Sequence, residues 1–486
     1  MDTIYIRSRR LRYIFSLALL SCVFLSACSP ALVARQAGLD TLFDDRLFAG
    51  ARWGAAAVSV DTGDIIYRRD DTKAFVPASN IKLFTTAVAL LKLGPDFRYT
   101  TKLYASGETI NGILYGDLFL LGSGDPTLSA SAFESWADSL SRSGIKEIRG
   151  TIVGDDHFLD DVHLGAGWSW EDETFGYASQ ISGLSFNDNS VDIEIRPGEK
   201  IGDPAILRIT PDTGYVSVIN HAITAPFADA CKSLSFFREQ GSNRIRVEGT
   251  ICLQSPPLHE KLSVHNPARF AVTVFRHMLE SRGIHVSGDP VSIDEFITPP
   301  DYSLMREVAF HTSPPLNEII KATNKWSNNL YAEQLFRTLG RMFGGKGSTE
   351  KSAEVMRKAL SSMGIPSESL AIYDGSGLSR LNLVTPLQTV MLLEYMARHE
   401  YFPFYYASLP VAGIDGTLRR RMKNGPAENN VRAKTGSFRQ VTVLSGYTTT
   451  KEGKLIAFSL MSNNYLGPSA NTRALEDRFC EILTDK

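Results

Sequence analysis

Apolar stretches near both ends of the chain predict the strands of one sheet. Residues 53–60 and 65–68 are rich in apolar side chains, and they flank the turn-forming residues 61–64. This pattern is typical of a β-hairpin. Near the other end, residues 441–448 and 455–462 have the same character. We therefore expect a sheet that N-terminal and C-terminal segments build together.

Helical patterns accompany these strands. Residues 81–91 carry apolar side chains at the spacing of a mostly buried helix, and a Gly-Pro pair at 94–95 ends it. Residues 471–483 have a similar pattern. A sheet flanked by helices places the protein in the α/β (α+β) fold class. We expect residues 28–95 and 302–486 to form one discontinuous domain.

The region between these two segments, residues 96–301, has a different character. Helical periodicity occurs at residues 129–143 and 268–282, and turns are frequent. We expect this β-rich region to be an insertion made of two accessory domains, one nested in the other. Short apolar stretches predict its strands at residues 99–104, 114–121, 148–153, 191–195, 206–210, 216–219 and 244–252.

The N-terminus has the pattern of an export signal. Arginines between positions 7 and 12 precede an apolar run at 13–25, which is too short to span a bilayer comfortably. The run closes in Leu-Ser-Ala-Cys, which resembles a bacterial lipobox. The resemblance implies that residues 1–27 are a lipoprotein signal peptide and that Cys28 becomes the lipidated anchor of a protein of the periplasm or cell envelope. Ordinary cleavage at nearby small residues is the alternative.

Charge and cysteine content narrow the possible partners. The net charge is −2 and no basic run is present, which argues against nucleic acid as a partner. No stretch after the signal is apolar enough to cross a membrane, so any anchoring depends on Cys28. Cys231 and Cys252 can form a disulfide in an exported chain. Cys480 is expected to be a buried apolar residue of the terminal helix.

Three short motifs carry the candidate chemistry. They are Ser-Asn-Ile-Lys at 79–82, Ser-Asn-Asn at 327–329 and Lys-Thr-Gly at 434–436. The Ser-x-x-Lys pattern also occurs at 143–146 and 348–351, and Ser-x-Asn recurs elsewhere. The position of each copy and the elements predicted around it must therefore distinguish the functional copy from the others. The copy at 143–146 follows a predicted helix as a surface turn would, and the copy at 348–351 comes after the second motif.

Ser79 is the candidate nucleophile. It lies at the start of a predicted helix, where free backbone N–H groups and the positive end of the helix dipole face outward. Lys82 follows three residues later on the same helix face, which places an amine beside the hydroxyl. A lysine acts as a base only when neutral, so its pKa must be lowered by burial or by a neighbouring cation. The alternative is that Ser79 only caps the helix.

The second and third motifs offer groups for proton transfer and for charge. Ser327 supplies a hydroxyl that can relay a proton, and Asn329 supplies an amide that can hold a substrate carbonyl or the base. Lys434 supplies positive potential for a substrate carboxylate and can also help to lower the pKa of Lys82. Taken alone, the Ser-Asn-Asn triplet is more often part of a turn.

The residues after Lys434 can bind the substrate. Thr435 can donate a hydrogen bond to a carboxylate, and Gly436 lets a ligand approach the strand backbone. The backbone N–H groups of Ser79 and Ser437 are then candidate donors of an oxyanion hole. Without the other two motifs, this stretch would be equally typical of a solvated strand end.

In this order, the three motifs resemble those of the penicilloyl-serine transferases, which are the penicillin-binding proteins and serine β-lactamases. The long gap at 83–326 is the mark of the low-molecular-mass class C penicillin-binding proteins, the D-alanyl-D-alanine carboxypeptidase/endopeptidase family. Segments 121–127, 184–189 and 374–380 fit the same family. The resemblance implies a transpeptidase-like domain, an acyl-enzyme on Ser79, peptidoglycan stem peptides as substrates and acylation by β-lactam antibiotics.

The resemblance adds three candidate substrate contacts. Asp172 is expected to bind the amine of the diamino acid in the stem peptide, Arg380 borders the site, and Arg439 stands where relatives often carry a neutral polar side chain. No metal or cofactor is expected, since the histidines form no spaced ligand pair. Two other functions stay open: a serine β-lactamase with fast deacylation, and a non-catalytic peptidoglycan-binding module.

Overall fold

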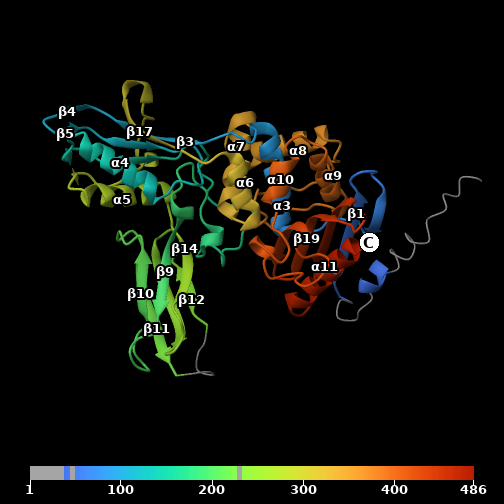
Figure 1. Cartoon of the computed structure of the whole chain (residues 1–486). Coiled ribbons are helices and arrows are strands. Elements are labelled where there is room, and N and C mark those ends of the chain that lie inside the picture. Colours follow the sequence, from blue (N-terminus) through green and yellow to red (C-terminus); the bar gives the residue numbers. More distant parts are fainter. Residues whose placement is uncertain (1–37, 44–49, 227–232, 486) are drawn as a thin grey trace, which may run out of the picture. The chain divides into compact units, whose positions relative to one another are not determined.

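The computed structural model describes residues 38–43, 50–226 and 233–485 (Figure 1). The predicted signal peptide and Cys28 lie outside the described residues, and so does Cys231. Their assignments therefore stay predictions.

The chain divides into two compact units, residues 1–49 and 50–486. The first unit contributes the 3-10 helix η1 (Thr41–Phe43), and the second contains all the sheets of the described residues. In the ranges that the structure describes, no helix combines the length and the apolar character needed to cross a membrane.

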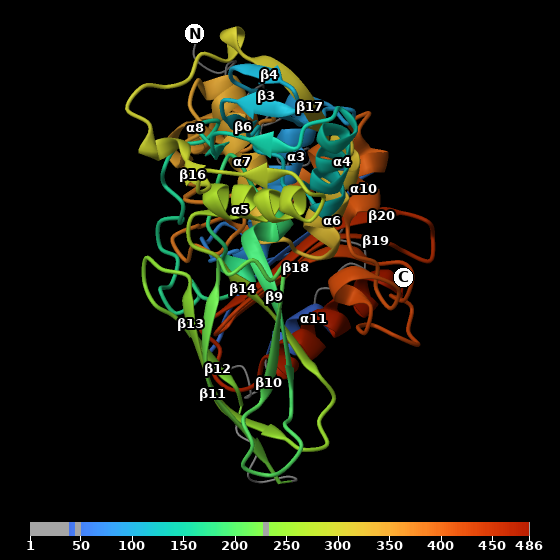
Figure 2. The ribbon, with the colours of Figure 1, turned by 90° about the vertical axis from the view of Figure 1, so that its left-hand side faces the viewer.

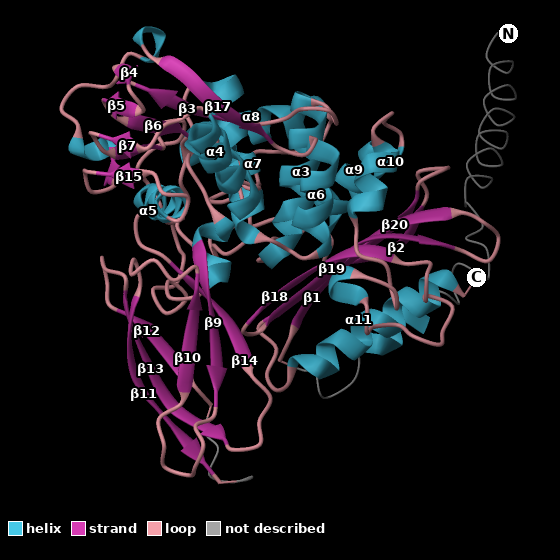
Figure 3. Ribbon diagram, turned by 60° about the vertical axis from the view of Figure 1, so that its left-hand side comes forward, coloured by secondary structure: helices cyan, strands magenta, loops and turns pink. Residues whose placement is uncertain are grey.

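One antiparallel sheet joins the two ends of the second unit. Its order is β18-β19-β20-β1-β2, so a strand from the N-terminal part pairs with a strand from the C-terminal part (Figure 3). The four expected strands are present, and β18 is an additional one that the apolar pattern did not reveal. The strands are β1 (Arg52–Ser59), β2 (Ile65–Arg69), β18 (Arg432–Phe438), β19 (Val441–Thr449) and β20 (Leu455–Asn463).

Helices cover both faces of this sheet. The C-terminal helix α11 packs against one face, and the remaining helices lie on the other (Figure 3). Helix α3 is buried on almost every side, which explains its nearly continuous apolar sequence. The helices of this domain are α3 (Ile81–Leu93), α6 (Leu316–Lys325), α7 (Asn329–Gly344), α8 (Thr349–Ser362), α9 (Pro386–Ala397), α10 (Phe402–Ser408) and α11 (Ser469–Thr484).

The chain leaves this domain after α3 and forms a separate layered region with two sheets and the helices α4 (Ala130–Arg142) and α5 (Pro267–Glu280) (Figure 2). One sheet has the order β16-β8-β6-β3-β17 and the other β15-β7-β5-β4. The strands are β3 (Thr100–Ala105), β4 (Glu108–Ile110), β5 (Ile113–Tyr115), β6 (Leu118–Leu121), β7 (Glu147–Ile148), β8 (Ile152–Asp155), β15 (His285–Val286), β16 (Val291–Ser292) and β17 (Arg306–Thr312).

The inserted region begins and ends at neighbouring strands. Strand β17 pairs with β3, so we propose that the insertion extends to residue 312 and that the helices of the first domain resume after it. At the crossing, the backbone N–H of Tyr99 donates to Ser313 Oγ over 2.9 Å. The apolar pattern did not predict β17, because this strand is mostly exposed.

A second set of strands is nested within the inserted region. Two three-stranded sheets, β10-β9-β14 and β11-β13-β12, face each other across apolar side chains (Figures 1 and 2). We propose that these strands form an accessory domain of their own within the larger insertion. Cys252, at the end of β13, is disulfide-bonded. The strands are β9 (Ser190–Arg196), β10 (Ile206–Thr210), β11 (Ser217–Ala225), β12 (Ser235–Arg238), β13 (Arg244–Cys252) and β14 (Leu258–Ser263).

Buried polar contacts fasten the insertion to α7. Arg337, which is 1% exposed, donates to Asp160 Oδ1 over 2.5 Å. Gln334 donates to the carbonyl of Ser182 over 2.6 Å and to Ser185 Oγ over 2.7 Å. Because α7 starts at the second motif, these contacts hold the insertion against the site.

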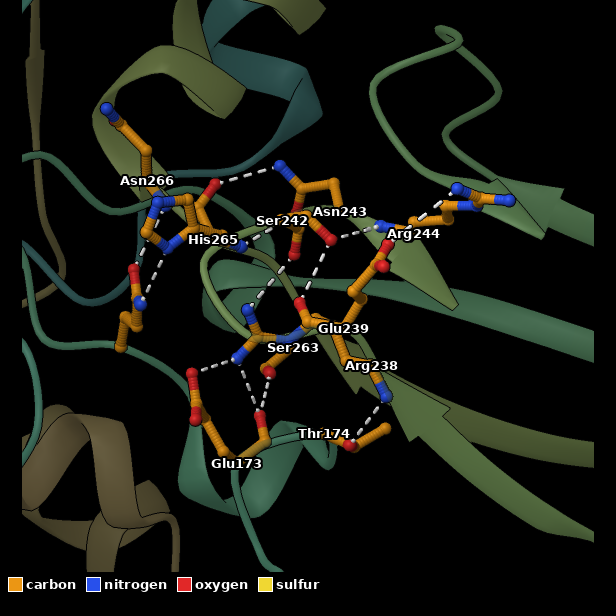
Figure 4. A network of polar contacts seen from close by, with 11 residues as sticks. Glu173, Thr174, Arg238, Glu239, Ser242, Asn243, Arg244, Ser263, His265 and Asn266 are labelled. Atoms are coloured by element: carbon orange, nitrogen blue, oxygen red, sulfur yellow. Dashed lines mark hydrogen bonds and ion pairs between the residues drawn. The ribbon is translucent and has the colours of Figure 1, made fainter. Parts of the chain in front are cut away.

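A second network connects the nested strands to the segment that reaches the site (Figure 4). Arg238 of β12 donates to Glu173 Oε1 over 2.8 Å, and its backbone N–H donates to Thr174 Oγ1 over 3.0 Å. Ser263 Oγ donates to the carbonyl of Glu173. Contacts from two strands therefore hold residues 173–174 in place. These residues shortly precede Tyr177, whose carbonyl accepts a hydrogen bond from Asn329 of the second motif.

Candidate active site

Ser79 lies in the 3-10 helix η3 (Ala78–Asn80), which runs directly into α3. The first residue of η3 has a φ of 45°, so the backbone is strained just before the serine. The side-chain amide of Asn80 donates to the carbonyl of Lys434 over 3.1 Å and ties η3 to β18. Gly436 permits this close approach, because a Cβ there would lie 2.7 Å from the carbonyl oxygen that precedes η3.

Lys82 is buried beside Ser79, and its amine has three hydrogen-bond partners. Its Nζ lies 3.0 Å from Ser79 Oγ, 2.6 Å from Asn329 Oδ1 and 2.5 Å from the carbonyl oxygen of Ser376. The two carbonyl oxygens can only accept hydrogen bonds. A neutral amine therefore uses its two protons on Asn329 and Ser376, and its lone pair faces the hydroxyl of Ser79.

Burial favours this neutral form. It lowers the pKa of Lys82 from 10.5 to about 7, while the negative charges of Asp374 and Glu333 act in the opposite direction. Burial or a neighbouring cation is what the sequence requires for this pKa, and burial is the main cause in the structure. Burial also lowers the pKa of Lys434, and the positive charge of Lys82 lowers it further.

Glu333 holds the loop that contacts Lys82, and the sequence analysis did not identify this residue. Its Oε1 accepts hydrogen bonds from the backbone N–H groups of Gly375, over 2.9 Å, and Ser376, over 2.7 Å. This holds the Ser376 carbonyl that Lys82 contacts. Burial, together with the charge of Asp374, raises the pKa of Glu333 to about 7. A carboxylate among the apolar residues of α7 was the only sequence signal for it.

The second and third motifs meet at Ser327 and Lys434. Lys434 is fully buried, and its Nζ donates to Ser327 Oγ over 2.9 Å and to the carbonyl of Thr435 over 2.8 Å. Ser327 has a left-handed backbone with φ of 60°, and Asn328 caps α7 by accepting from the N–H of Tyr331. This turn directs the Ser327 hydroxyl toward the strand.

A cavity of about 300 Å³ opens beside these groups. Thr435 Oγ1 donates to Thr417 Oγ1 over 2.8 Å at its wall, and the cavity continues past Ser437 toward α11. All three motifs contribute to it or to its wall. The lining residues are Ser79, Ser327, Thr417, Arg421, Thr435, Gly436, Ser437, Thr442, Arg473 and Glu476.

The family of the chain follows from its whole length as well as from this site. The model of the D-Ala-D-Ala carboxypeptidase 3 (S13) family matches residues 35–485. The chain belongs to this family. The family predicted from the three motifs is confirmed, and the protein is a D-alanyl-D-alanine carboxypeptidase.

Relatives of the carboxypeptidase match most of its length. The D-alanyl-D-alanine carboxypeptidase of Actinomadura sp. (strain R39) is 35% identical over 481 residues, 95% of this chain and 88% of the relative. DacB of Haemophilus influenzae is 29% identical and covers 86% of this chain and 87% of its own. The crystal structure of H. influenzae penicillin-binding protein 4 has a TM-score of 0.81 at 28% identity and covers 92% of this chain and 98% of that chain. The predicted fold class is confirmed.

The insertion of the carboxypeptidase brings Asp172 near the second motif. Asn329 donates to the carbonyl of Tyr177 over 2.7 Å, and the phenol of Tyr177 donates to Asp172 Oδ1 over 2.7 Å. Burial and the bond to Asp172 raise the pKa of Tyr177, so it stays a donor. The sequence did not single out Tyr177, which lies in the short 3-10 helix η4 (Gly176–Ala178).

The two other charged candidates lie together outside the cavity lining. Arg380 Nη2 donates to the carbonyl of Arg439 over 3.0 Å, and its guanidinium stacks 5.0 Å from the ring centre of Phe438. Both arginines are exposed. They border the strand that carries the third motif without touching Ser79 or Lys82 in any contact that the structure records.

One group of potential metal ligands lies in the insertion. His157, Asp161 and Asp294 place ligand atoms within 4.8 Å of one another, and all three are exposed. None of them lines the cavity at Ser79.

Proposed function

We propose that the carboxypeptidase cleaves its substrate through an acyl-enzyme on Ser79, with Lys82 as the base. The observation that supports this most directly is the 3.0 Å contact between Lys82 Nζ and Ser79 Oγ, combined with two carbonyl acceptors that take up the other protons of the amine. A lysine with a pKa of about 7 is neutral in a large fraction of molecules at neutral pH.

Acylation begins when Lys82 accepts the proton of Ser79. The freed oxygen attacks the carbonyl carbon of the penultimate D-alanine, and negative charge develops on the carbonyl oxygen. The backbone N–H groups of Ser79 and Ser437 are the proposed donors to that oxygen. Thr435 binds the carboxylate of the terminal residue, on the wall of the cavity.

The leaving amine requires a proton. Ser327 and Lys434, which are joined by a 2.9 Å hydrogen bond, form the proposed relay to that nitrogen. When the C–N bond breaks, the terminal amino acid leaves with a proton from this relay. Lys82 gives the relay the proton that it took from Ser79 and is neutral again, and the acyl group stays on Ser79. Water then attacks the ester with Lys82 again as the base, which restores the free hydroxyl.

The proposed substrates are peptidoglycan stem peptides, including peptides cross-linked to a second stem. Asp172 is the proposed partner for the amine of the diamino acid, and Arg380 and Arg439 are further contacts at the rim. β-Lactam antibiotics are proposed to acylate Ser79. A structure of H. influenzae penicillin-binding protein 4 in complex with a β-lactam, 27% identical to this chain, supports this.

The proposed location is the periplasm or cell envelope, with Cys28 lipidated. A cell-wall substrate and the sequence of the first 28 residues support this assignment. Mass spectrometry of the N-terminal peptide of the mature protein tests it. An unmodified N-terminus at another residue would contradict the lipid anchor and leave the catalytic proposal untouched.

Intact-mass measurement after penicillin exposure tests the nucleophile. The wild type should gain the mass of one penicillin, and Ser79→Ala should gain none. Ser143→Ala is the matched control, because Ser143 belongs to another Ser-x-x-Lys copy and lies outside the cavity lining. An adduct on Ser79→Ala would overturn the assignment, and rapid steady turnover of a chromogenic cephalosporin by the wild type would favour a β-lactamase.

A further inference from the structure

The cavity extends well beyond the nucleophile on the leaving side of the substrate. From Ser79 and Thr435 it continues along β18 to Ser437 and reaches α11 at Arg473. In a strand, alternate side chains share one face, so Thr435 and Ser437 both point into this space. A group bound at Thr435 is therefore next to Ser437 and the side chains that surround it.

Two arginines line this extension, and one of them is already neutralised. Arg421 Nη2 lies 2.9 Å from Glu476 Oε2 and 2.6 Å from Asp477 Oδ1. Glu476 is 1% exposed, and burial raises its pKa. This cluster holds α11 in place and offers little net positive charge to a ligand.

Arg473 differs from Arg421 in its exposure and in its ion pairs, although its charge also acts on nearby Asp477. It is exposed, and among the described residues its guanidinium makes no ion pair. Its recorded side-chain partner is Ser437 Oγ, at 3.4 Å, which is a weak hydrogen bond. Its backbone carbonyl accepts from Arg421 Nη2 over 3.1 Å, so the residue is held at the cavity edge by the neutralised cluster.

Lys434 does not provide an equivalent charge in the cavity. It is fully buried, is not among the lining residues, and uses its protons on Ser327 and the carbonyl of Thr435. Its pKa is lowered by burial and by the charge of Lys82. An arginine keeps its charge at every pH at which the enzyme is folded.

We propose that Arg473 binds the free carboxylate of the leaving D-amino acid and makes the enzyme selective for substrates that carry this carboxylate. The inference rests on the proposed function, since it identifies a residue that binds the leaving group at the Ser79 site. Both possible leaving groups fit it: a terminal D-alanine and the D-centre of a cross-linking diamino acid each carry a carboxylate beside the amine that is released. Arg473 thus determines specificity and takes no part in proton transfer.

A pair of matched peptides tests this directly. Diacetyl-L-Lys-D-Ala-D-Ala ends in a carboxylate, and the same peptide as its C-terminal carboxamide does not. We expect Arg473→Gln to lower kcat/KM for the acid about tenfold, mainly through KM, and to leave kcat/KM for the amide within about twofold, because a charge-assisted hydrogen bond is lost only with the acid. Arg473→Lys should retain part of the preference.

Arg478→Gln is the matched control on the same helix. Arg478 is exposed and pairs with Glu481 over 3.0 Å, away from the cavity. Its replacement should therefore leave kcat/KM unchanged for both the acid and the amide peptide. The proposal would be overturned if Arg473→Gln lowered kcat/KM equally for the acid and the amide peptide, or if the ratio of the two kcat/KM values did not change. If Ser79→Ala still cleaved the acid peptide, the proposed function itself would fail, which is a separate result.

Discussion

Replacing Glu333 by glutamine tests how the buried site sets the protonation of Lys82. Glutamine keeps an oxygen that can accept from the N–H groups of Gly375 and Ser376, so the loop that carries the Ser376 carbonyl stays in place. The substitution removes a negative charge that raises the pKa of Lys82. The pKa of Lys82 should therefore fall below about 7 in the variant.

The size of the effect follows from the pKa of Lys82. A shift from 10.5 to about 7 corresponds to about 5 kcal/mol against the charged form. In the wild type, about half of the Lys82 amines are neutral at pH 7 and roughly a tenth at pH 6. Glu333 itself has a pKa of about 7, so its negative charge acts on Lys82 mainly at and above this pH. If the loss of this charge lowers the pKa of Lys82 by about one further unit, the neutral fraction of Lys82 at pH 7 rises from about half to about nine-tenths.

The rate of acylation by a fluorescent penicillin, measured by stopped flow between pH 5 and pH 9, reports this titration. The wild-type rate should rise with pH and level off above about 7, since the reactive form is the deprotonated amine. In Glu333→Gln the midpoint should move to lower pH, although the plateau is lower because a less basic amine is a weaker base.

The matched control removes an exposed charge from a neighbouring helix. Glu354 lies on α8 and pairs with Lys351 and Lys358 at the surface. Glu354→Gln should leave the midpoint where it is in the wild type. A wild-type rate that does not change with pH, or a midpoint that stays or rises in Glu333→Gln, would refute the account of how Lys82 is deprotonated.

Three further substitutions test other contacts. Gly436→Ala should slow acylation at least about tenfold in the penicillin assay, because its Cβ would meet a backbone oxygen at 2.7 Å and push η3 from β18; an unchanged rate would contradict this. Ser327→Ala should lower kcat about 10²-fold or more for the peptide, with a normal melting temperature. Asp160→Asn should cost about 3–5 kcal/mol in urea unfolding, since it leaves the buried Arg337 without its carboxylate; a loss below about 1 kcal/mol would argue against the pair.

The sequence predicted the part of the site that local pattern encodes. Ser79 and Lys82 are three residues apart on one helix, so their contact follows from helical geometry. The strands of the central sheet, apart from β18, were evident because apolar residues dominate them. β18 escaped notice because it carries the third motif, whose polar residues break the alternation that predicts a strand.

Contacts between distant segments could not be predicted in the same way. Glu333 acts on Lys82 through a loop that lies 42–43 residues away from it in sequence, and no periodic pattern connects them. Tyr177 reaches Asn329 through its backbone carbonyl, which leaves no trace in the residue type. Both depend on how the insertion and α7 pack, and that is a property of the folded chain.

The neighbouring strands β3 and β17 give the protein a particular architecture for evolution and for protein engineering. An insertion whose two ends lie on adjacent strands leaves and re-enters the first domain at neighbouring points, as a surface loop does. Such a region can be inserted without rearranging the sheet of that domain. In this chain the insertion also supplies partners to the domain that it leaves, because Asp160 pairs with the buried Arg337 and Trp168 donates a hydrogen bond to Asp374 over 2.9 Å. A shortened protein that joined residues 98 and 313 directly would keep all three motifs, but it would leave Arg337 without its carboxylate partner and Asp374 without its indole donor. We therefore expect a shortened enzyme to require substitutions at both of these positions.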